Sequence, residues 1–209
     1  MNVKPWLLAA LLPCTAMASS SNQGALSISS SSFTDGGVIA LQQVGQEPAC
    51  GAGEERTPQL SWNNLPAGTR SLALIMFDPD GGKGIGVVHW VAYNIDPEHD
   101  GLKEGMAGLS GQYVTVGRNS RGTLSYRGPC PPAGDNPHHY ALTLIATDLP
   151  LGTLPEGLDR SGLLQLLQGH ALGAQSLIGR YAEVYTSPPR PNSHRLMLGD
   201  HSSTGLAPK

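Results

Sequence analysis

Runs of apolar residues that favour β-structure dominate the hydrophobic pattern of the chain. Segments 71–77 and 87–95 are near-continuous apolar runs, as expected of strands that are buried on both faces. Segment 139–149 is rich in β-branched and apolar residues and also predicts a strand. Shorter stretches predict further strands at 26–28, at 60–62, within 112–117 and at 177–185.

One segment has helical spacing instead. Asp159 or Ser161 can cap its N-terminus, and Gly173 can end it. The apolar positions between these residues recur on one helical face, at Leu163, Leu164, Leu166, Leu167 and Ala171. Many strands with one clear helix predict an all-β sandwich with helical decoration.

Composition agrees with this fold class and excludes one kind of partner. The 209 residues suffice for one domain with a sizeable core. The 27 glycines and 17 prolines, with only 14% charged residues, favour many short strands and turns over long surface helices. The formal net charge is −3 and no basic run occurs, so the chain lacks the electrostatic footprint of a nucleic-acid-binding protein.

The first 18 residues have the pattern of a signal peptide. Lys4 supplies a positive charge, 6–12 form a short apolar run, and 16–18 read Ala-Met-Ala, a small-x-small cleavage site. The apolar run is too short to span a bilayer. We therefore expect export to the periplasm or beyond, a flexible N-terminus at 19–25, a domain at 26–186, and a flexible tail at 187–209 that is rich in Pro, Ser and Gly.

The cysteines are consistent with export. Cys14 lies in the predicted signal peptide, so Cys50 and Cys130 remain in the mature chain. Two cysteines in an oxidising compartment favour a disulfide bond. The alternative is a pair of buried free thiols. A bridge would tether the region of Cys50 to the loop that contains Cys130.

Polar residues suited to anion binding stand beside the stiffest backbone of the chain. Segment 128–132, Gly-Pro-Cys-Pro-Pro, is rigid because proline fixes φ, and His138 and Tyr140 follow it closely. Asp78 ends one buried run, and His89 lies in the next. Each feature also has a purely structural explanation, namely an Asp-containing turn, a hydrogen-bonded core histidine and a packed tyrosine. Their coincidence favours one wall of an anion pocket.

These segments resemble the phosphatidylethanolamine-binding protein family, in its bacterial Raf-kinase-inhibitor-like branch. The matching blocks extend over roughly 26–185. They are Asp78-Pro79-Asp80, His89-Trp90-Val91-Ala92-Tyr93-Asn94-Ile95, Gly128-Pro129-Cys130-Pro131-Pro132, His138-His139-Tyr140, the helix with His170, Gly179-Arg180-Tyr181, and Cys50 with Thr57-Pro58-Gln59-Leu60-Ser61-Trp62. The resemblance implies two antiparallel sheets with one or two short helices near the C-terminus, and a small pocket beside the last helix. It implies that this pocket takes anions or a phospholipid headgroup, with a lining of Asp78, Asp80 behind it, His89, Cys130, Pro131, His138 and Tyr140.

The resemblance favours a non-enzymatic binding module that is regulatory or inhibitory. It implies a small anion or phospholipid headgroup as ligand, with a kinase or a protease as a possible protein partner. We expect no cofactor or resident metal, because the sequence has no His-Glu-x-x-His or other closely spaced ligand motif. The alternative is a metal- or His/Asp-dependent hydrolase that uses the same pocket. If His89 and His138 donate to the anion as charged imidazoles, with Asp78 favouring their charge, affinity for phosphate falls as pH rises through the histidine range.

Overall fold

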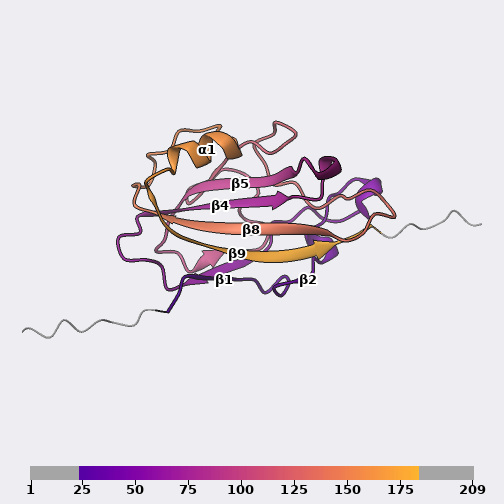
Figure 1. The fold of residues 1–209 in the computed structure, drawn as a ribbon, viewed down its shortest axis with the longest axis horizontal. Helices are drawn as coiled ribbons and strands as arrows, with labels where there is room; N and C mark the ends of the chain where they lie inside the picture. Colours follow the sequence, from indigo (N-terminus) through magenta and orange to yellow (C-terminus); the bar gives the residue numbers. More distant parts are fainter. Residues whose placement is uncertain (1–23, 184–209) are drawn as a thin grey trace, which may run out of the picture.

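The fold consists of two packed sheets with one short helix. The computed structural model describes residues 24–183 (Figure 1). The smaller sheet has the order β1 (Ser27–Ser29), β3 (Leu60–Asn63), β6 (Gly101–Leu102). The larger has the order β2 (Gly37–Val38), β9 (Ala171–Tyr181), β8 (His138–Thr147), β4 (Ser71–Asp78), β5 (Val87–Ile95), β7 (Thr115–Val116). The predicted all-β sandwich is confirmed, with one parallel pair, β2 with β9, among otherwise antiparallel neighbours.

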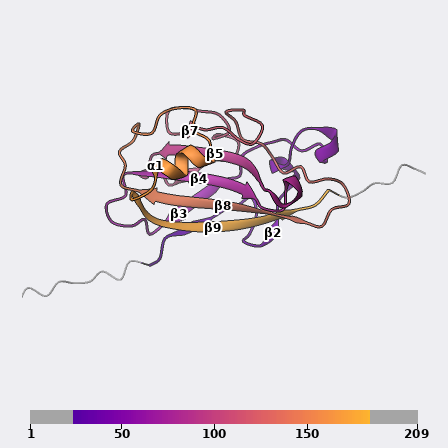
Figure 2. The same cartoon turned by 45° about the horizontal axis from the view of Figure 1, so that its top comes forward.

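Strand β4 is the centre of the larger sheet and is buried on both faces, as its apolar run predicts. It pairs with β8 from Ser71↔Thr147 to Phe77↔Ala141 and with β5 on its other edge. Because side chains alternate along a strand, Leu72, Leu74 and Met76 face the core between the sheets. Ala73 and Ile75 face a second apolar cluster, which the helix α1 (Arg160–Leu166) covers (Figure 2).

Helix α1 is shorter than the sequence pattern predicts. Asp159 caps it, with its Oδ1 accepting from the amide of Gly162 at 2.7 Å, but the helix ends at Leu166 rather than near Gly173. Strand β9 begins at Ala171 and pairs with β8 along its whole length. A short isolated helix is only marginally stable, so the ladder with β8 takes residues that helical spacing alone assigns to the helix.

The antiparallel order brings three distant segments to one end of the larger sheet. Strand β4 ends there at Asp78, β5 enters with His89 as its third residue, and β8 begins with His138. This end lies at the right in Figure 1. The strand order, rather than any local motif, therefore assembles the candidate site.

The predicted signal peptide and the predicted flexible tail from residue 187 lie outside the described residues. Within residues 24–183, no helix has the length and apolar character needed to cross a membrane.

Candidate anion-binding pocket

A cavity of about 430 Å³ opens at this end of the larger sheet. Every predicted site residue except Tyr140 lines it, and α1 contributes none of the lining. Basic residues that sequence reasoning did not include lie there too. The lining residues are Asp78, Asp80, Gly81, Gly82, Lys83, Val87, His89, Ser120, Arg121, Arg127, Cys130, Pro131, Pro132, Asp135 and His138.

Asp78 is the buried acid of the pocket, with only 3% of its surface exposed. Its Oδ1 accepts hydrogen bonds from the backbone amides of Asp80 at 2.9 Å and Gly81 at 3.0 Å. The local turn predicted from the Asp-Pro-Asp-Gly sequence is therefore present. Its Oδ2 remains for the pocket and lies 2.8 Å from Nδ1 of His138. The same residue thus holds the turn and orients a histidine.

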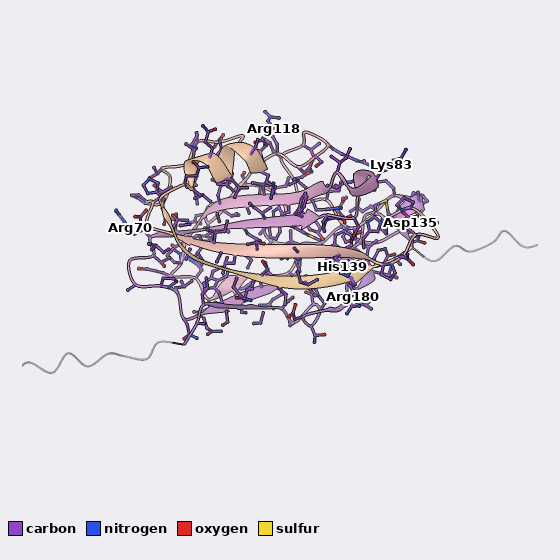
Figure 3. All side chains as sticks on the ribbon, in the orientation of Figure 1. Arg70, Lys83, Arg118, Asp135, His139 and Arg180 are labelled. Carbon is purple, nitrogen blue, oxygen red and sulfur yellow. A yellow bond between two sulfur atoms is a disulfide. The ribbon has the colours of Figure 1, made fainter. Side chains whose placement is uncertain are left out.

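His138 is fixed by this contact. With Asp78 ionised, Nδ1 of His138 carries the proton and donates it to the carboxylate. The other ring nitrogen, Nε2, lies 3.6 Å from Oδ2 of Asp135, which belongs to the loop before β8. Asp135 also lines the cavity and lies at the same end of the molecule as His139 (Figure 3).

His89 is held differently and is neutral at neutral pH. Its Nδ1 lies 3.0 Å from the backbone carbonyl of Arg127, which only accepts hydrogen bonds, so Nδ1 is the donor. Burial lowers the pKa of His89 and outweighs both this hydrogen bond and the Asp78 carboxylate, which lies 3.9 Å from Nε2. Asp78 favours the charged imidazole, as expected, but burial outweighs it, so the expectation that His89 donates as a charged imidazole is wrong.

Tyr140 lies behind the pocket rather than in its lining. The side chain is fully buried and packs edge-on against the ring of His89, with the ring centroids 5.1 Å apart. Its hydroxyl has no hydrogen-bond partner among the described residues, and burial raises its pKa well above the ordinary range. In this arrangement Tyr140 supports the ring of His89, and its contact with a ligand stays a prediction.

Asp80 sits at the rim and is occupied by its own partner. Its Oδ2 accepts from the backbone amide of His139 at 2.8 Å and lies 2.9 Å from Nδ1 of the same residue. The hydrogen bond from the His139 side chain is the main cause that lowers the pKa of Asp80. This pair links the turn after β4 to the start of β8, and the predicted support of the ligand by Asp80 from behind stays a prediction.

Three basic side chains, Lys83, Arg121 and Arg127, also line the cavity. Glu47 holds the two arginines, because its Oε1 accepts from Nη1 of Arg121 at 2.9 Å and from Nη1 of Arg127 at 3.2 Å. The proximity of Arg127 to the Gly-Pro-Cys-Pro-Pro segment was the one available signal for this group. Nothing in the sequence points to Glu47, which is 80 residues away from Arg127.

The predicted disulfide bond between Cys50 and Cys130 is present, and Cys130 lines the cavity. The adjoining loops are packed backbone to backbone, with the amide of Gly45 donating to the carbonyl of Pro129 at 3.0 Å. Gly128 has no room for a side chain, since a Cβ there would overlap the backbone of Gln43 and Gly45. This close approach fixes the wall that contains Cys130.

Chemically, the pocket is a cavity that combines buried acceptor groups at the ends of central strands with three cations from the adjoining loops. Such an arrangement suits an anionic or hydrogen-bonding ligand, and ligand binding by these residues stays a prediction.

Comparison with known proteins gives the family. A family model described as "Phosphatidylethanolamine-binding protein" matches residues 29–182. A "UPF0098 protein" of Methanothermobacter thermautotrophicus is 43% identical over 131 residues, covering 62% of this chain and 84% of the relative. The "Putative lipoprotein LppC" of Mycobacterium tuberculosis is 36% identical over 156 residues, covering 75% of this chain and 72% of the relative. The crystal structure of YbcL of Escherichia coli superposes with a TM-score of 0.69 at 24% identity, covering 76% of this chain and 99% of YbcL.

The chain therefore belongs to the phosphatidylethanolamine-binding protein family. Its sequence relatives, among them YbcL of Escherichia coli at 31% identity over 164 residues, place it in the bacterial and archaeal branch that includes YbcL, and the resemblance in the sequence motifs is confirmed at that level.

Proposed function

We propose that this protein is a non-enzymatic binding module for small oxyanions of the phosphoryl class. The observation that supports this most directly is the single cavity that joins the Asp78–His138 pair and His89 to the cations Arg121 and Arg127. Arginine is suited to phosphate because its planar fork of donors matches the oxygens. The family name, which refers to a phosphorylated headgroup, supports the same ligand class.

We further propose a regulatory or inhibitory role outside the cytoplasm. The Cys50–Cys130 disulfide is typical of an oxidising compartment, and one relative is named as a lipoprotein. The bound anion would then belong to a free metabolite, a lipid headgroup or a protein partner. Native mass spectrometry of protein isolated without added phosphate identifies what the cavity carries.

Calorimetric titration with inorganic phosphate tests the binding site. Arg127→Gln removes a cation from the lining, and loss of one charge-assisted hydrogen bond of about 1.5–3 kcal/mol corresponds to an affinity about 10–100-fold weaker. Arg70→Gln is the matched control, because Arg70 lies at the opposite end of the molecule (Figure 3). Equal affinities for the two variants, or no binding by the unsubstituted protein, would contradict the assignment.

A hydrolase remains the second candidate because of one feature. An imidazole whose Nδ1 donates to a buried carboxylate, with Nε2 left for the cavity, has the geometry of a general base. Hydrolysis of phosphate or carboxylate esters that is abolished by His138→Gln would establish this function. Stoichiometric zinc in the purified protein would favour its metal-dependent form.

A further inference from the structure

The three buried polar side chains that line the cavity, those of Asp78, His89 and His138, share one property: each offers it a hydrogen-bond acceptor. The proton of neutral His89 is on Nδ1, which donates to the carbonyl of Arg127. Nε2 therefore presents a bare lone pair. Oδ2 of Asp78 lies 3.9 Å from this nitrogen, too far for a hydrogen bond between the two.

The second histidine repeats this arrangement. Nδ1 of His138 donates to Oδ2 of Asp78, so its Nε2 is also an acceptor in the neutral ring. Asp78 itself offers only lone pairs, and its Oδ1 already receives two backbone amides. With both rings neutral, the base of the cavity therefore combines two imidazole nitrogens and a carboxylate oxygen that have no proton to give.

The groups with protons to give are elsewhere in the lining. Arg121 and Arg127 meet at Glu47, and Lys83 lies on the turn after β4. The titratable and charged groups that face His89 and its neighbours in the cavity are Asp78, Asp80, Asp135, His138, Lys83, Arg121 and Arg127, with Tyr140 behind the ring. A ligand that fits has negative oxygens toward the arginines and an O–H group toward the base.

We propose that this pocket selects tetrahedral oxyanions that carry a proton, such as hydrogen phosphate, over proton-free oxyanions of the same shape, such as sulfate. This inference rests on the proposed anion-binding function and specifies its ligand class. A proton-free oxygen set against Asp78 and the bare Nε2 of His89 would leave buried acceptors unpaired and in mutual repulsion. An O–H of the ligand pairs with one of them instead.

The proton balance separates the two kinds of ligand. Hydrogen phosphate brings its own proton, which bridges a ligand oxygen and an acceptor of the pocket, and no proton is taken from solution. Sulfate has none, so one proton must come from solvent to occupy the same bridge, on Nε2 of His89. Phosphate monoesters carry a proton only below their second pKa of about 6, and phosphodiesters, including phospholipid headgroups, do not carry one at neutral pH.

The experiment is calorimetric titration of the unsubstituted protein at pH 7.5 with phosphate, sulfate, phosphoethanolamine and glycerophosphoethanolamine. We expect phosphate to bind at least about 100-fold more tightly than sulfate, because sites with unpaired buried polar groups discriminate strongly. Sulfate affinity should fall about tenfold per pH unit above the pKa of His89, since one proton is taken up. Phosphate affinity should change far less between pH 6.5 and 8. The monoester should bind more tightly at pH 5.5 than at 7.5.

A substitution reverses the preference by changing an acceptor into a donor. Asp78→Asn keeps a carbonyl oxygen for the two backbone amides and puts an NH₂ group beside Nδ1 of His138. Nδ1 then accepts a hydrogen bond, and the proton of neutral His138 moves to Nε2, where it is a donor toward the cavity. Sulfate should gain at least about tenfold relative to phosphate in this variant. If Asp78→Asn does not fold, the four ligands and the pH series on the unsubstituted protein still decide the matter.

The outcomes separate this inference from the proposed function. Binding of phosphate and sulfate with equal affinity, tighter binding of sulfate, or tight pH-independent binding of the diester would each overturn the proton requirement and leave the oxyanion site standing. Failure of all four ligands to bind would overturn both.

Discussion

The disulfide between Cys50 and Cys130 should contribute a large share of the stability of this domain. The two cysteines are 80 residues apart, and in the chain-entropy model such a loop lowers the entropy of the unfolded chain by about 15 cal/mol/K. At 25 °C this corresponds to about 4.5 kcal/mol. Since each kcal/mol shifts the midpoint of a domain of this size by about 2–4 °C, reduction should lower Tm by about 9–18 °C.

The test compares oxidised and reduced forms of the unsubstituted protein by urea and thermal unfolding. Reduction keeps both sulfur atoms in place, so no cavity is created at the buried Cys50. A Cys50→Ala/Cys130→Ala variant should match the reduced form, apart from a small cavity term. A difference below about 1 kcal/mol between the oxidised and reduced forms would refute the loop-entropy reasoning. Two free thiols in the unfolded, unreduced chain would refute the bridge itself.

Three further outcomes follow from single positions. Because the pKa of His89 is lowered in the native state, the unfolded chain binds more protons than the native state below about pH 6.5. The free energy of unfolding therefore falls as pH decreases below that value. His89→Asn should flatten this part of a urea-unfolding pH series. Gly128→Ala should lower both stability and phosphate affinity because of the backbone overlap described above, whereas Gly111→Ala, where a Cβ meets nothing within 4 Å, should leave both unchanged. Leu142→Ala, at a fully buried position, should lower the free energy of unfolding in chemical denaturation by about 2–5 kcal/mol. Leu172→Ala, at an exposed position, should lower it by less than about 0.5 kcal/mol. Equal losses would show that the central core is not where the structure places it.

The long buried strands could be predicted from the sequence because their pattern has no competing explanation. The runs 71–77 and 87–95 became β4 and β5 within a residue of their predicted ends. The helix near the C-terminus could not be bounded in the same way. Its apolar spacing continues to Ala171, yet the ladder with β8 depends on contacts that no local pattern contains.

The candidate site, too, could be predicted only where its residues have a local signal in the sequence. Residues attached to strand ends or to the proline-rich loop could be found from sequence, because a stiff backbone next to polar groups is a local signal. Glu47 could not, since its role comes only from holding Arg121 and Arg127 across the fold. The protonation of His89 could not be found either, because burial of its ring and the carbonyl that fixes its tautomer are both tertiary facts.

The division of the pocket between strands and loops has an evolutionary consequence. Asp78, His89 and His138 are fixed by the three most central strands of the larger sheet, so substitutions that displace them also disturb folding. Arg121, Arg127 and Glu47 lie on connecting segments, where changes of length and charge are tolerated. Proteins that descend from one ancestor can therefore acquire different partners through the loop residues of the pocket while they keep the same carboxylate and imidazole chemistry on its strands.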